Sequence, residues 1–227
     1  MSSSSRYIYQ RFRHHVLMAV VASILVAGVY FLTPPPDVRH RLSMGTAYAA
    51  MAFLVASLWL GPWNVLRRRA NPVSFDLRRD LGIWAGALAL AHTGVGLTVH
   101  LRGRMWMYFL KGLHPVRLQA NQFGAANYTG LLAALLFVVL LVISNDASLR
   151  RLGTKSWKSL QRWTYIAAGL TVAHGVLFQL IEKRKPGWVV IFYTGAAAAV
   201  LVQLAGFLRV RANRQLPVAG KNQVLPR

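Results

Sequence analysis

The chain lacks cysteine and is poor in acidic residues: its 227 residues include five Asp and Glu against 27 Lys and Arg, a formal net charge of +22. The absence of cysteine excludes a disulfide scaffold, Cys-ligated zinc and iron–sulfur sites, and thiol nucleophiles. Charged residues make up 14% of the chain, against about 25% in an ordinary globular domain. The chain is 55% hydrophobic, and its charges lie in short clusters between long apolar runs, a pattern that excludes a soluble domain and a disordered basic tail.

The positive charge does not indicate a nucleic-acid binder. Such a protein exposes its cations on a hydrated surface, whereas here they lie in short clusters between six apolar runs of 16 to 21 residues. The runs are residues 16–32, 43–60, 81–99, 128–143, 163–181 and 188–208. About 20 residues cross a bilayer as a helix, and these runs lack the two-residue alternation of barrel strands. We therefore predict an all-α polytopic membrane protein, a bundle of six transmembrane helices.

The predicted bundle occupies residues 16–208, between an N-terminal segment at 1–15 and a basic tail at 209–227. The first run is longer than a signal-peptide core and is followed by three prolines, which favours a retained span. Eighteen basic residues fall on the side of the termini and nine on the other side. The positive-inside rule then predicts a multi-pass protein of the cell (inner) membrane with both termini cytoplasmic. Since no Gly-rich nucleotide-binding pattern is present, we expect the chain to hold only the membrane part of any redox enzyme.

Two of the seven histidines, His92 and His174, lie well inside predicted spans. Each is 11 residues beyond the start of an outward-running helix, so both lie about 16 Å from the cytoplasmic edge. Two neutral imidazoles at one depth are what axial ligation of haem iron requires, which makes both residues candidate metal ligands. Hydrogen bonds between helices and a proton relay are the alternatives. A relay is disfavoured because no Asp, Glu, Lys or Arg lies well inside any span.

Small residues share the helical faces of these two histidines. They are Ala85, Ala89 and Gly96 beside His92, and Ala167 and Thr171 beside His174. Small side chains leave room for a flat porphyrin, and they equally allow close packing of membrane helices. On the sequence alone, both interpretations stand.

Arg102 and Arg104 directly follow the third predicted helix. Because guanidinium groups pair with carboxylates, both are candidates to bind the propionates of a haem. Anchoring at the membrane interface is the alternative for both, and an aromatic belt is the first interpretation of the neighbouring segment 106–109.

Two stretches of the chain resemble a known family. Residues 77–92, LRRDLGIWAGALALAH, contain paired Arg, then Leu-Gly, then a His ten residues after the Gly. Residues 127–174 carry a Gly in the fourth helix, a Ser at its end, then Leu-Gly, Trp, Leu-x-Arg, Tyr and His. Together they are similar to ferric-reductase-like transmembrane domains. That family includes NADPH oxidases, six-transmembrane metalloreductases and, most similar to this chain, the haem-binding membrane subunit of bacterial methionine-sulfoxide reductase.

The resemblance implies a b-type haem held by His92 and His174, and electron transfer across the membrane. Many relatives carry a second histidine in the fifth helix, thirteen residues before the position of His174. Here that residue is Gln161, and Arg79 lies at the same level on the third helix. We therefore expect one haem b per chain.

The sequence thus predicts a membrane haem protein that relays electrons from a cytoplasmic donor to an acceptor on the outer side. The donor would be a flavoprotein reductase or a membrane quinol. The acceptor would be a periplasmic protein, ferric iron or oxygen. A non-redox membrane protein with structural histidines, such as a small transporter or an assembly factor, is the competing class.

Overall fold

The computed structural model describes residues 3–34, 37–68 and 75–215. Its long helices are α1 (Ser3–Leu32), α2 (Val38–Leu66), α3 (Phe75–Gly96), α4 (Gln122–Ile143), α6 (Trp163–Ile181) and α7 (Pro186–Gln215). The shorter elements are the 3-10 helices η1 (Leu101–Gly103) and η2 (Met105–Tyr108), the strands β1 (Leu110–Leu113) and β2 (Val116–Leu118), and the helix α5 (Asp146–Gln161). The strands pair as one antiparallel hairpin. All the other elements are helices, so the predicted all-α architecture is confirmed.

The six long helices correspond to the six predicted spans. Five stretches are long and apolar enough to cross a membrane: Tyr9–Leu32, Val38–Leu66, Gln122–Ile143, Asp146–Ile181 and Pro186–Arg214. Helix α3 is not among them because its apolar part is too short. Its first turns carry the charged residues Arg78, Arg79 and Asp80, and it ends at Gly96. A multi-pass helical membrane protein is established, and the count of six rests on including α3.

Short polar side chains fix where three helices begin. The side chains of Asp37, Asn121 and Asn145 accept hydrogen bonds from the first-turn backbone N–H groups of α2, α4 and α5, at 2.7, 2.8 and 2.8 Å. These caps satisfy N–H groups that have no partner within the helix. Because Asn145 starts a helix, the loop expected after the fourth span is the amphipathic helix α5, in which Gly153 permits a kink at φ 71°.

Two helices extend beyond their predicted limits. Helix α1 already begins at Ser3, within the segment 1–15, and α7 continues to Gln215, seven residues past the predicted end of the sixth span. Polar and basic residues continue a helix readily once it leaves the bilayer. The rest of the predicted tail, residues 216–227, lies outside the described residues, as does Arg69 in the loop between α2 and α3.

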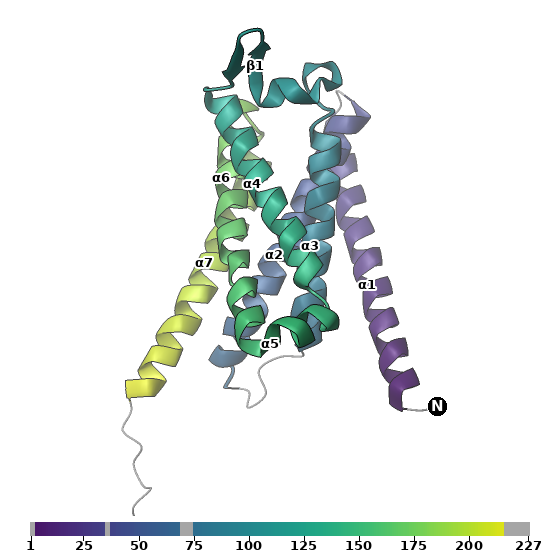
Figure 1. Ribbon diagram of the computed structural model, residues 1–227, viewed down its shortest axis with the longest axis vertical. Coiled ribbons are helices and arrows are strands. Elements are labelled where there is room, and N and C mark those ends of the chain that lie inside the picture. The colour runs from purple at the N-terminus through teal and green to yellow at the C-terminus, as the bar shows by residue number, and fades with distance from the viewer. Residues whose placement is uncertain (1–2, 35–36, 69–74, 216–227) are drawn as a thin grey trace, which may run out of the picture.

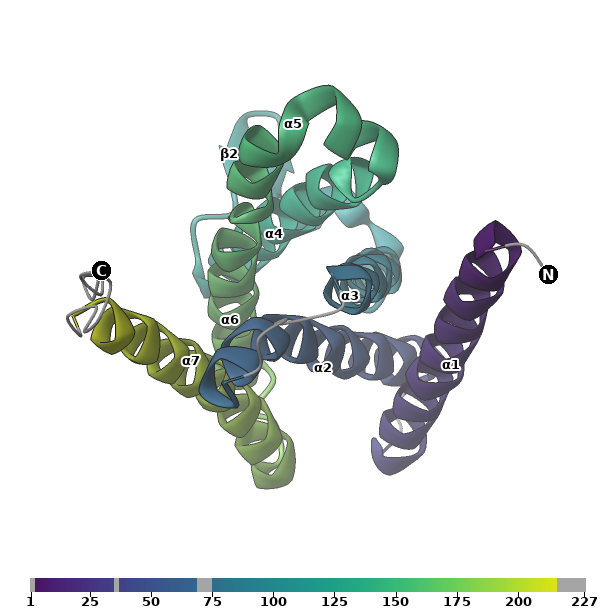
Figure 2. The same cartoon turned by 90° about the horizontal axis from the view of Figure 1, so that it is seen from below.

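The helices form an upright bundle in which α2 contacts α1, α3 and α7, while α4 contacts α3 and α6 (Figures 1 and 2). The start of α1, the helix α5 and the end of α7 lie at one end of the bundle, and the β-hairpin lies at the other (Figure 1). The segments that charge counting assigns to one side of the membrane therefore do share one end. We name the hairpin end the outer end and the opposite end the inner end, after the topology that the sequence predicts.

The outer loop between α3 and α4 is built around a buried tyrosine. Tyr108 is 2% exposed; its hydroxyl donates to the Gly96 carbonyl at 3.1 Å and accepts from the backbone N–H of His100 at 2.7 Å. Burial raises the pKa of this hydroxyl, which favours its neutral, donating form. Tyr108 thus ends α3 three residues before the predicted limit at Val99, and it is a buried cap where an aromatic belt was expected.

Candidate functional site

The structure brings together the two histidines that the sequence singles out. His92 on α3 and His174 on α6 face each other with ring centroids 6.0 Å apart and planes inclined at 73°. Helix α3 packs between α2 and α4, and α4 packs against α6, so the two rings meet inside the bundle rather than on its lipid face. The two histidines, predicted to lie at equal depth on separate helices, are therefore direct neighbours in the structure.

Backbone carbonyls orient both imidazoles. His92 Nδ1 lies 3.0 Å from the Ser43 carbonyl oxygen on α2, with the Ser43 hydroxyl oxygen 3.3 Å away. His174 Nδ1 lies 2.7 Å from the Ala126 carbonyl oxygen on α4. Because a carbonyl oxygen only accepts, each Nδ1 carries the proton, and each Nε2 keeps a lone pair. This is the arrangement that orients histidine for binding a metal through Nε2.

The spacing of the rings fits one metal ion between them. A metal–nitrogen bond to histidine is about 2.0 Å long, so two imidazoles that share one metal ion have their ring centres several ångströms apart. The observed centroid separation of 6.0 Å is compatible with such a shared metal ion. Among the described residues, no cluster of three or more His, Asp or Glu side chains forms a metal site, so a metal here would need its other ligands from elsewhere, as a porphyrin provides them.

Both histidines line a cavity of about 230 Å³ that runs toward the outer end of the bundle. Gly130 on α4 lies against the ring of His174: a Cβ atom at this position would lie 2.5 Å from His174 Nδ1 and 2.7 Å from Cε1. Contacts this close are not tolerated, so only glycine admits the ring at this position. The wall is otherwise mainly apolar, with Phe137 and Phe178 among its aromatic residues.

The predicted accessory residues divide into three groups. Gly96 and Thr171 line the cavity. Ala85 does not line it; it is fully buried in the apolar core with Ala167, which supports the packing interpretation for these two residues. Arg102 and Arg104 are exposed and lie outside the cavity wall, because the chain turns at Leu101 and Arg102 with φ of 56° and 54°.

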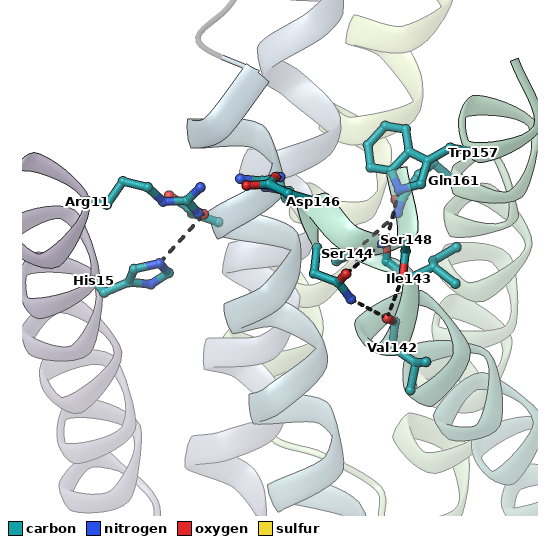
Figure 3. Close-up of polar contacts among 12 residues, drawn as sticks. Arg11, His15, Val142, Ile143, Ser144, Asp146, Ser148, Trp157 and Gln161 are labelled. Atoms are coloured by element: carbon teal, nitrogen blue, oxygen red, sulfur yellow. Dashed lines mark hydrogen bonds and ion pairs between the residues drawn. The ribbon is translucent and has the colours of Figure 1, made fainter. Parts of the chain in front are cut away.

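At the inner end, Gln161 lies where many relatives carry a second histidine, and Arg79 lies at the same level on α3. Both side chains make structural contacts in this region (Figure 3). Gln161 Nε2 donates to the Ser144 hydroxyl at 3.3 Å, and the indole N–H of Trp157 donates to the Ile143 carbonyl at 2.8 Å. Arg79 forms an ion pair with Asp146 at 2.5 Å. The side chains that replace two imidazoles therefore tie α3, α4 and α5 together.

Sequence reasoning missed several residues of this site. Ser43 and Ala126 bind the two histidines through their backbone carbonyls, and because every residue has a carbonyl, the sequence does not identify them. Gly130 was noticed only as part of a family pattern, although a lone Gly in an otherwise Leu-rich span is a signal of close approach. Arg184, which lines the outer end of the cavity, follows α6 in a short loop that charge counting treated only as a topology marker.

Comparison with known proteins shows the family of this chain. The family model described as "Ferric reductase like transmembrane component" matches residues 44–172, which include His92 and Gly130 and end two residues before His174. The chain is also 27% identical, over 176 residues, to the protein-methionine-sulfoxide reductase heme-binding subunit MsrQ of Klebsiella pneumoniae subsp. pneumoniae; the match covers 77% of each chain. Since the family model covers more than half of the sequence, this protein belongs to the ferric-reductase-like transmembrane family.

Proposed function

We propose that this protein is a haem b-binding electron-transfer subunit of the membrane, which carries electrons from a cytoplasmic donor to an acceptor at the outer end. The observation that carries the proposal is the adjacent pair His92 and His174, each with Nδ1 hydrogen-bonded to a backbone carbonyl, which leaves Nε2 with a lone pair that can bind a metal. Family membership and the relative named as a heme-binding subunit support it independently.

The protein's own part is binding and orientation. His92 and His174 would hold the haem, which supplies a one-electron iron couple when bound. The Ser43 and Ala126 carbonyls hold the imidazoles in the ligating tautomer, and Gly130 leaves the room that the His174 ring needs. The apolar wall around the rings excludes water and gives the site a low dielectric.

The electron partners are proposed by chemical class. On the inner side we propose a flavoprotein reductase or a membrane quinol as the donor. On the outer side we propose a protein acceptor, since the relative in Klebsiella is named as a subunit of protein-methionine-sulfoxide reductase; ferric iron and oxygen are the other acceptor classes.

The proposed direction of transfer depends on topology. A reporter fused after Arg69 or after Arg227 should be active in the cytoplasm, and one fused after Arg117, on β2 at the hairpin end, should be active outside. Paired alkaline phosphatase and fluorescent-protein fusions measure this. The reverse pattern would exchange the donor and acceptor sides.

The proposed stoichiometry is one haem per chain, because Gln161 and Arg79 make structural contacts where a second ligand pair would lie. A pyridine haemochrome assay on purified protein should give a b-type spectrum and a ratio near one. A ratio near two would show an unconventional ligand at the inner end. A colourless protein that takes up no haem would favour the non-redox class.

A further inference from the structure

The cavity carries a polar group at its outer end, away from the histidine pair. Its wall there includes His40, Tyr48, Gln179 and Arg184. Arg184 is the only Lys or Arg among the described residues that line the cavity. Helix α6 continues seven residues from His174 to Ile181, about 10 Å at about 1.5 Å per residue, and Arg184 lies in the loop just beyond.

The Arg184 guanidinium donates a hydrogen bond to the neutral imidazole of His40. Its Nη1 lies 3.0 Å from His40 Nε2, and because a guanidinium only donates, His40 accepts through an unprotonated nitrogen. Burial lowers the pKa of Arg184, and the charge of Glu182 opposes this only in part. The Glu182 carboxylate is itself bound by His100 Nε2 at 2.9 Å. Among the described residues the Arg184 guanidinium forms no ion pair with a carboxylate, and it lines the cavity.

Gln179 adds an acceptor to the same region. The Tyr48 hydroxyl donates to the Trp188 carbonyl at 3.0 Å and accepts from Gln179 Nε2 at 3.1 Å, which fixes the orientation of the amide. Gln179 Oε1 is then buried without a hydrogen-bond partner among the described residues. A buried unpaired acceptor is costly and calls for a donor such as water, which a carboxylate does not supply. The group at this end that suits a carboxylate is the Arg184 guanidinium, whereas the wall around the rings is suited to an apolar macrocycle.

We propose that Arg184 binds a carboxylate of the haem held by His92 and His174, so that the carboxylate edge of the haem faces the outer end of the bundle. The inference rests on the proposed function and assigns this role to Arg184 in place of the exposed Arg102 and Arg104. Arg184 is a positioning residue: it sets how the haem lies between its ligands, and it makes no contact with the iron.

The test is a double substitution, one in the protein and one in the cofactor. Apoprotein of wild type and of Arg184→Leu is titrated with haem and with haem dimethyl ester, which lacks the two negative charges. Arg184→Leu should weaken haem binding about tenfold to a hundredfold, the value of a charge-assisted hydrogen bond. It should leave binding of the ester unchanged, and wild type should bind the ester as weakly as the variant binds haem.

Three comparisons keep the result interpretable. Arg184→Lys, which keeps the charge, should recover part of the affinity, and Arg102→Leu and Arg104→Leu should bind haem as wild type does. Equal weakening of haem and ester by Arg184→Leu, or equal binding of both by wild type, would overturn the role of Arg184 while leaving haem binding intact. Wild type that binds neither compound would instead overturn the proposed function itself, and this inference with it.

Discussion

Replacing His92 or His174 with alanine is expected to abolish the six-coordinate bis-imidazole spectrum and leave a five-coordinate haem or none. Each ring would supply one Nε2 lone pair, and its Nδ1 is held by a backbone carbonyl, that of Ser43 for His92 and that of Ala126 for His174. Electronic absorption of purified protein, before and after addition of haem, measures the effect. Lower yield by itself is uninformative, because each substitution also leaves a cavity between α3 and α6.

His100→Ala is the matched control for the ligand variants. His100 lies past the end of α3, and its Nε2 is bound to the Glu182 carboxylate at 2.9 Å, an interaction that lowers the pKa of that carboxyl. The variant should keep a nearly unchanged spectrum. A normal spectrum in His92→Ala together with a lost one in His100→Ala would mean that the ligand pair has been wrongly assigned.

Gly130→Ala should have an effect almost as large, although glycine contributes no ligand atom. The added Cβ would lie 2.5 Å from His174 Nδ1, so the ring must move and give up its bond to the Ala126 carbonyl. We expect at least a tenfold loss of haem affinity, about 1.4 kcal/mol, and a shift toward five-coordinate iron. Haem titration and low-temperature electron paramagnetic resonance report the two effects separately.

Gly169→Ala is the matched control, since Gly169 lies on α6 like His174 and a Cβ there meets nothing within 4 Å. Exchange of Gly for Ala at an open helix position stabilises the helix by about 1 kcal/mol, so Gly169→Ala should bind haem normally. If Gly130→Ala and Gly169→Ala behave alike, the contact between α4 and the His174 ring does not limit haem binding.

The sequence by itself determined the helical class, the long helices and the two candidate ligands. Backbone polar groups have no water to bond with in a bilayer. Apolar runs of this length that lack the alternation of barrel strands therefore cross it as helices, which satisfy their backbone hydrogen bonds internally. A histidine in such a run stands out because polar residues there are costly and need partners. Position along a helix fixes depth at about 1.5 Å per residue, which is why His92 and His174 could be paired before any fold was known.

Tertiary structure decided everything that depends on rotation and on backbone partners. The Nδ1 bonds of the two histidines go to carbonyls of Ser43 and Ala126, and any residue type supplies a carbonyl. Arg184 lines the cavity, whereas Arg102 and Arg104 are exposed and lie outside its wall. Side-chain identity sets depth and chemistry, whereas helix rotation and loop direction are set by packing against neighbouring helices, which no single span encodes.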